Sequence, residues 1–141
     1  MIGRHRAVWT LTWCVLATVG PGPGALPALA GHGAPVTAPS IPAEQAKRLL
    51  GDGQGATFVD LRPVEAFREG RLPGARSVPL PQLRRRYDEI PHTGPIILYC
   101  ACSPNEMVAA YRFLSGEGFE DVSVLEEGYR GWVKRGYPLE R

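Results

Sequence analysis

Cys100 and Cys102, two thiols separated by one residue, are the side chains of this chain best suited to covalent chemistry. A thiolate attacks a sulfur or carbon centre and forms a covalent intermediate. Cys100 directly follows the apolar run 96–99 and precedes a predicted helix, and a helix N-terminus lowers the pKa of a nearby thiol. We therefore predict that Cys100 is a nucleophile, present as a thiolate without a partner base.

Cys102 allows more than one interpretation. It is a resolving thiol that releases sulfur from Cys100 or pairs with it in a reversible disulfide, or it is a loop residue without chemical role. A purely structural disulfide between residues two apart is disfavoured, because closing so small a loop removes little chain entropy.

The residues after Cys102 predict a firmly defined helix start. Ser103 to Glu106 fits a capping box, with Ser103 as the N-cap, Pro104 at the first helical position and Glu106 three residues past the cap. We expect the loop to bind anionic sulfur through backbone N–H groups, to which Pro104 contributes none. The predicted substrate-binding loop comprises Ala101, Cys102, Ser103, Asn105 and Glu106.

Several other thiol and metal chemistries are disfavoured. A cysteine peptidase needs a histidine partner, and neither His32 nor His92 is well placed to serve Cys100. A cysteine phosphatase needs an arginine six residues after the cysteine to hold a phosphate dianion, whereas this chain has Glu106 there. The histidines and cysteines lack metal-ligand spacing, so no metal is expected.

The N-terminus has the layout of a secretory signal. A basic start is followed by the apolar run 7–19, by Pro and Gly, and by an A-x-A site that ends at Ala30. We predict a signal peptide at 1–30, a linker at 31–40 and a domain at 41–141. The protein is then exported, to the periplasm in a Gram-negative host, or anchored in the inner membrane by an uncleaved segment.

The charge of the chain argues against nucleic acid as a partner. The full sequence has 16 basic and 14 acidic residues, and removal of Arg4 and Arg6 with the signal leaves 14 of each. A formally neutral mature protein lacks the basic excess that nucleic-acid binding requires. The run Arg84 to Arg86 is expected to be a solvated face.

Apolar runs alternate with helical patterns along the predicted domain. This alternation predicts an α/β fold, a single domain with a central, mainly parallel sheet and helices on both faces. Strands are predicted at 57–61, 75–80, 96–99 and 122–125, and helices at 42–50, 63–68, 81–90, 106–114 and 129–135. The thiols therefore follow a strand at the carboxyl edge of the sheet, where such folds bind ligands.

Three segments in order resemble the rhodanese-like domain family: 58–75 with its D-x-R turn, 97–100 ending in Cys100, and 124–138 with its G-Y-R-G-W stretch. The resemblance implies transfer of sulfane sulfur through a Cys100 persulfide, without a cofactor. The donor is thiosulfate or a low-molecular-weight persulfide, and the acceptor is a thiol, cyanide or a protein. Asp60 and Arg62 are implied to brace the neighbouring loops.

Two departures from the family pattern are present. The common loop resembles C-R-x-G-x-R, whereas this loop carries no cation from Cys100 to Glu106, which disfavours a dianionic donor. Arg71 stands where the family usually has His, and we expect it to be structural. The alternatives are therefore a non-catalytic binding or sulfur-delivery module, and a thiol-disulfide redox protein that uses Cys100 and Cys102.

Overall fold

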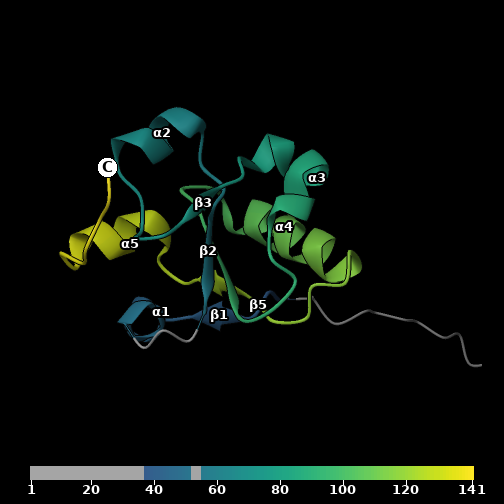
Figure 1. Cartoon of the computed structure of the whole chain (residues 1–141), viewed down its shortest axis with the longest axis horizontal. Coiled ribbons are helices and arrows are strands. Elements are labelled where there is room, and N and C mark those ends of the chain that lie inside the picture. The colour runs from purple at the N-terminus through teal and green to yellow at the C-terminus, as the bar shows by residue number, and fades with distance from the viewer. Residues whose placement is uncertain (1–36, 52–54) are drawn as a thin grey trace, which may run out of the picture. The chain divides into compact units, whose positions relative to one another are not determined.

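The computed structural model describes residues 37–51 and 55–141. The predicted signal peptide and most of the predicted linker lie outside the described residues. The described part forms an open sheet between two layers of helices (Figure 1).

The sheet has five strands in the order β1-β5-β4-β2-β3, and every neighbouring pair is parallel. The predicted parallel sheet is therefore confirmed. Its central strand, β4, is buried throughout, as expected for a strand covered on both faces. The strands are β1 (Ser40–Ile41), β2 (Thr57–Asp60), β3 (Arg76–Ser77), β4 (Ile96–Tyr99) and β5 (Val122–Leu125).

Alternation along β4 divides the core into two clusters, because successive side chains of a strand point to opposite faces. Ile97 and Tyr99 pack with Trp132 on one face, whereas Ile96 and Leu98 pack with Leu114 on the other. Helices α1 and α5 cover the first face, and α3 and α4 cover the second, so the predicted two-sided arrangement is confirmed. The helices are α1 (Ala43–Gly51), α2 (Val64–Glu69), α3 (Leu83–Arg86), α4 (Pro104–Gly116) and α5 (Gly128–Lys134).

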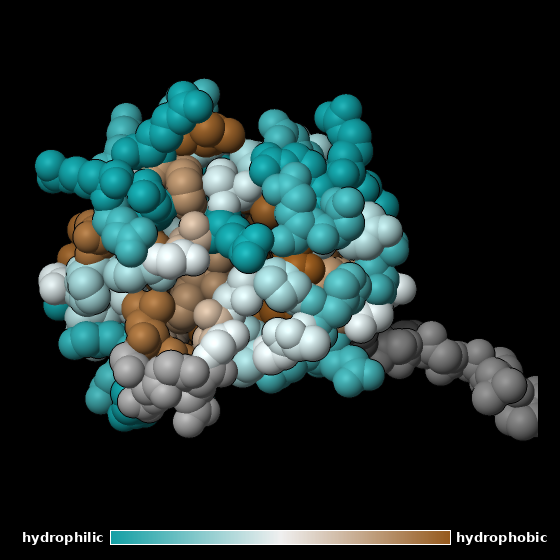
Figure 2. Space-filling model, viewed as in Figure 1, coloured by the Kyte–Doolittle hydropathy of each residue, from teal (hydrophilic) through white to brown (hydrophobic). Residues whose placement is uncertain are grey.

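Hydrophilic side chains cover the outer parts of the face seen in Figure 2, and apolar surface shows between them. Val133 and Leu139 are the large apolar side chains most exposed among the described residues, at 43% and 42%. No helix of the described ranges is both long and apolar enough to cross a membrane.

The structure differs from the sequence prediction at three elements. The strand predicted at 75–80 is shortened to β3, and Leu80 begins a 3-10 turn instead. The single helix predicted at 81–90 is instead a series of short turns: a 3-10 turn (Leu80–Gln82), α3, and a second 3-10 turn (Tyr87–Glu89). The series ends at Ile90, which is extended because Pro91 follows it. Strand β1 is absent from the sequence prediction, and its Ser40 falls within the predicted linker; two residues are too few to show an alternating pattern.

Candidate active site

Cys100 lies immediately beyond the carboxyl end of β4, at the edge where parallel sheets bind ligands. Its carbonyl oxygen accepts a hydrogen bond from the Tyr129 N–H at 3.3 Å. Gly128 has a φ of +55°, and a Cβ there would lie 2.5 Å from the same oxygen. The start of α5 therefore packs on the Cys100 backbone in a way that only glycine allows.

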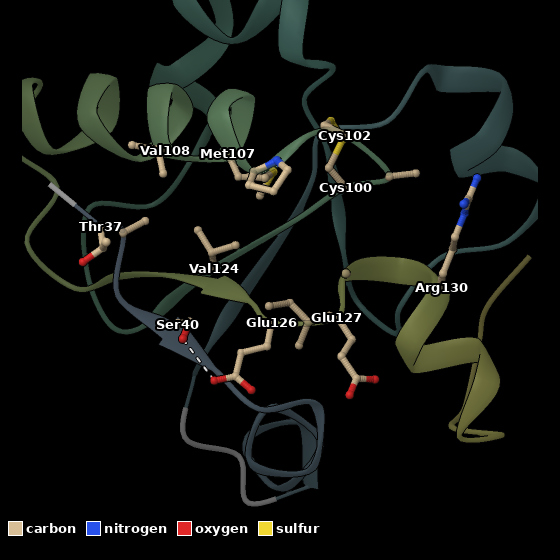
Figure 3. A pocket seen from close by; sticks show the side chains of 15 residues that line it. Thr37, Ser40, Cys100, Cys102, Met107, Val108, Val124, Glu126, Glu127 and Arg130 are labelled. Atoms are coloured by element: carbon tan, nitrogen blue, oxygen red, sulfur yellow. Dashed lines mark hydrogen bonds between the residues drawn. A yellow bond between two sulfur atoms is a disulfide. The ribbon is translucent and has the colours of Figure 1, made fainter. Parts of the chain in front are cut away.

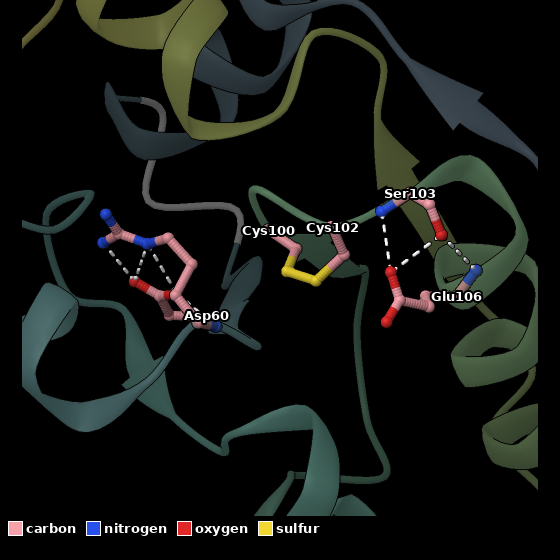
Figure 4. The surroundings of a disulfide bond; sticks show 6 residues. Asp60, Cys100, Cys102, Ser103 and Glu106 are labelled. Carbon is pink, nitrogen blue, oxygen red and sulfur yellow. Dashed lines mark hydrogen bonds and ion pairs between the residues drawn. A yellow bond between two sulfur atoms is a disulfide. The ribbon is translucent and has the colours of Figure 1, made fainter.

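The structure joins Cys100 and Cys102 by a disulfide, with 5.2 Å between their Cα atoms (Figure 4). Cys100 is 8% exposed and belongs to the core cluster on the α4 face, whereas Cys102 is partly buried at the edge of that cluster. The nucleophile predicted from the sequence is thus present in its oxidised form. Reduction must precede any attack by its thiolate.

The predicted capping box at the start of α4 is confirmed (Figure 4). The Ser103 hydroxyl accepts from the Glu106 N–H at 3.4 Å, and the Ser103 N–H donates to the Glu106 carboxylate at 2.8 Å. The Ser103 hydroxyl also donates to that carboxylate at 2.7 Å. Hydrogen bonds from the Ser103 hydroxyl and then from its N–H lower the pKa of Glu106 below its ordinary value of 4.5.

The capping box corrects one part of the predicted anion-binding loop. The sequence prediction has the Ser103 N–H facing the sulfur, but this group is used by Glu106 and does not point to a ligand. The N–H groups of Ala101, Cys102 and Asn105 have no hydrogen-bond partner within the described ranges. They are the groups of the predicted loop that stay available to an anion.

Asp60 and Arg62 form a buried ion pair at the end of β2, next to β4. The Arg62 side chain donates to both Asp60 oxygens, at 2.9 Å from Nε and 2.6 Å from Nη2, and also donates to the Gly70 carbonyl at 2.7 Å. Burial lowers the pKa of Arg62, but the Asp60 carboxylate outweighs it, so the net shift is upward. The pair therefore ties β2 to the segment that follows α2.

Arg62 extends this connection to α5. Its guanidinium lies 3.5 Å from the centre of the Tyr129 ring, and Tyr129 is the residue whose N–H binds the Cys100 carbonyl. Within the described residues, the side-chain hydrogen bonds of Arg62 go to Asp60 and Gly70 and not to the cysteine loop. The pair therefore reaches the loop through Tyr129 rather than directly.

A pocket of about 560 Å³ opens beside the two cysteines (Figure 3). Its apolar wall includes Met107 and Val124, and its rim includes Glu126, Glu127 and Arg130. The volume lies in the range of pockets that bind small organic ligands. The two carboxylates already have partners, because Glu126 accepts from the Ser40 hydroxyl and Glu127 pairs with Arg135.

Sequence reasoning does not assign Glu126, Glu127 or Arg130 to the site. The segment 124–138 carries part of the family resemblance, and its aromatic residues are expected in the core. These rim residues reach the pocket because β5 lies next to β4, a contact between segments that are distant in sequence. Arg130 is a cation outside the cysteine loop that lines this pocket.

The residues of the described ranges contain no group of three His, Cys, Asp or Glu side chains arranged to hold a metal ion.

The protein is a parallel α/β domain with a cysteine between a central strand and a well-capped helix. The profile of the rhodanese-like domain family matches residues 42–135. The chain belongs to the rhodanese-like domain family.

Relatives and solved structures agree with this assignment. The thiosulfate sulfurtransferase GlpE of Pseudomonas putida is 32% identical over 100 residues, covering 71% of this chain and 88% of GlpE. The Bacillus subtilis protein YqhL is 35% identical over 77 residues, and the match covers 55% of this chain and 60% of YqhL. A rhodanese-related protein of Thermoplasma volcanium superposes with a TM-score of 0.62 at 25% identity, covering 72% and 97% of the two chains. The family and the similarity to GlpE support a role in sulfur transfer in general.

Proposed function

We propose that this protein is an exported sulfurtransferase that carries sulfane sulfur as a persulfide on Cys100. The observation that carries the proposal is the position of Cys100 between the carboxyl end of β4 and the capped N-terminus of α4. The positive end of the helix dipole and the unpaired N–H groups of the loop favour a thiolate and an anionic persulfide there.

The reaction has two steps that need no cofactor. In the first, the Cys100 thiolate attacks the outer sulfur of a donor and forms the S–S bond of the persulfide, while the remainder of the donor leaves as sulfite or as a thiolate. In the second, an acceptor thiolate or cyanide attacks the outer sulfur, and Cys100 leaves as a thiolate. The sulfur changes carrier without net oxidation or reduction.

The site favours an organic persulfide over thiosulfate as the donor. The loop from Cys100 to Glu106 holds no cation, so it offers a dianionic donor such as thiosulfate only backbone N–H groups and the helix dipole. The pocket beside the cysteines has an apolar wall and a volume of about 560 Å³, which suits an organic body. We expect glutathione persulfide to be used with a higher kcat/KM than thiosulfate.

A turnover assay tests the proposal. The reduced protein is supplied with either donor and with cyanide, and thiocyanate is measured. Cys102→Ser, which keeps the nucleophile and cannot close a disulfide with it, should form thiocyanate, whereas Cys100→Ser should form it only at the uncatalysed rate, because the thiolate nucleophile is missing. Equal activity of Cys100→Ser and Cys102→Ser would rule out this mechanism, and a preference for thiosulfate would overturn the donor assignment.

Export is part of the same proposal, and it rests on the sequence of residues 1–30. We expect cleavage after Ala30, so the exported protein begins at Gly31. Cell fractionation followed by intact-mass measurement checks this. A full-length mass in the membrane fraction would instead support the alternative of an uncleaved N-terminal anchor, and a full-length soluble cytoplasmic protein would contradict both.

A further inference from the structure

The contact between the two cysteine sulfurs defines a second reaction at this site. We infer that Cys102 resolves the Cys100 persulfide, expelling its outer sulfur as hydrosulfide and closing the Cys100–Cys102 disulfide. This inference rests on the proposed function, because it requires a persulfide on Cys100. It adds an activity that simple sulfur transfer lacks: reductive release of sulfide.

The reaction balances in atoms and electrons. The Cys102 thiolate attacks the Cys100 Sγ of the persulfide, a new S–S bond forms between the two side chains, and the bond to the outer sulfur breaks. The electron pair of that bond leaves with the outer sulfur of the anionic persulfide, which takes up the proton lost by the Cys102 thiol and departs as hydrosulfide. The sulfane sulfur is reduced by two electrons, and the two cysteines are oxidised by two.

The loop geometry places Cys102 at the inner sulfur of that persulfide. The two Cα atoms lie 5.2 Å apart and the two Sγ atoms are bonded, so the Cys102 sulfur reaches the Cys100 Sγ without rearrangement of the backbone. The backbone is fixed on both sides, by the Tyr129 N–H on the Cys100 carbonyl and by Glu106 on Ser103. A thiol held this way competes well with acceptors from solution, because its attack is intramolecular.

Closing the cycle requires a dithiol reductant, either a small molecule or a protein with two thiols. One of its thiolates attacks the disulfide, and its second thiol releases the mixed disulfide, which restores both cysteines. Cys102 is the more accessible target, because it is only partly buried whereas Cys100 is 8% exposed. The overall reaction then consumes a persulfide or thiosulfate and a dithiol, and produces hydrosulfide, a disulfide, and the thiol or sulfite left by the donor.

A single-turnover experiment on the full chain tests the inference. Wild type, Cys100→Ser, Cys102→Ser and Glu120→Gln are reduced, freed of reductant under nitrogen, and mixed with one equivalent of thiosulfate or glutathione persulfide. Sulfide and intact mass are then measured. Glu120→Gln is the control, because Glu120 is exposed between α4 and β5, lies outside the cysteine loop, and leaves both thiols in place.

Wild type and Glu120→Gln should release about one sulfide per chain and end about 2 Da lighter than the reduced protein, as disulfide closure requires. Cys102→Ser should release no sulfide above background and should gain about 32 Da, one sulfur atom, because its persulfide has no resolving thiol. Cys100→Ser should do neither.

Two different failures are distinguishable in this experiment. A stable persulfide on wild type, with no more sulfide than Cys102→Ser releases, would overturn the resolving role of Cys102 and leave the proposed sulfurtransferase intact. No gain of sulfur by Cys102→Ser with either donor would overturn the proposed function itself. Release of sulfide by Cys102→Ser at the wild-type level would assign the release to a thiol other than Cys102.

Discussion

At the scale of single residues, Gly128 is as important to the site as the cysteines it faces. It lies at the start of α5, with a φ of +55°, and leaves no space for a side chain against the Cys100 carbonyl oxygen. The motif around Gly128 therefore has a physical role at the site: it lets α5 approach the backbone of Cys100. A side chain at this position would displace the cysteine loop.

We predict that Gly128→Ala lowers both stability and sulfur loading. The positive φ alone costs roughly 1–2 kcal/mol for a residue with a Cβ, and the clash with the Cys100 carbonyl adds to it. Gly136→Ala is the matched control, because Gly136 has a φ of +64° and a Cβ at this position would meet no neighbouring atom within 4 Å. Urea denaturation, and persulfide loading in the Cys102→Ser background, check this; equal effects of the two substitutions would contradict the role of the close contact.

At the scale of elements, β4, the cysteine loop and α4 form the unit that makes the site. The sequence predicts this unit correctly, because the apolar run, the cysteines and the capping box are contiguous and each is a local signal. The turns at 80–90 escape prediction, because the positions of Leu83 and Ile90 are set by the core that they enter. Local helical spacing does not report such packing.

The capping box predicts a pH dependence of stability. The pKa of Glu106 is lowered in the folded protein, so its contribution is fully present above its ordinary value of 4.5 and is lost as the pH falls through the lowered value. We expect Glu106→Gln to lower the urea midpoint at about pH 7, and the difference from wild type to shrink below about pH 4.

Glu120→Gln, at an exposed glutamate between α4 and β5, is the control and should leave the midpoint nearly unchanged at both pH values. Thermal and urea denaturation of the three proteins at both pH values measure this. A deficit of Glu106→Gln that is independent of pH would show that its carboxylate charge does not stabilise the start of α4.

At the scale of the whole domain, the Asp60–Arg62 pair connects elements that the chain order keeps apart. Arg62 joins β2 to the segment after α2 through Gly70, and reaches α5 through the Tyr129 ring. The D-x-R pattern indicates a bracing role, but the sequence alone does not show that the brace ends on α5. That contact depends on the order of strands in the sheet.

We predict that Arg62→Met destabilises the domain by about 3–5 kcal/mol, because it leaves the buried Asp60 carboxylate without its partner. The double variant Asp60→Asn/Arg62→Met should lose less, because no uncompensated charge remains buried. Arg62→Lys, which keeps the charge but not the bidentate contact, should lie between wild type and Arg62→Met. Urea denaturation measures all three, and a double variant less stable than Arg62→Met would contradict this explanation.

The sequence indicates the parts of the site that are formed by neighbouring residues, and not those that the sheet brings together from distant segments. The thiols, the helix cap and the α/β pattern are read from neighbouring residues. The pocket rim at Glu126 and Arg130 comes from a segment about 25 residues away, brought beside β4 by the sheet. The capping-box pattern itself assigns the Ser103 N–H to the Glu106 carboxylate. The full pattern therefore excludes this N–H from the anion-binding groups.

The most direct test of the account is the intact mass of reduced Cys102→Ser after exposure to glutathione persulfide, compared with Cys100→Ser treated in the same way. We predict that Cys102→Ser gains one sulfur atom, about 32 Da, and that Cys100→Ser gains none. No gain by Cys102→Ser, or an equal gain by Cys100→Ser, would contradict the claim that Cys100 carries the transferred sulfur.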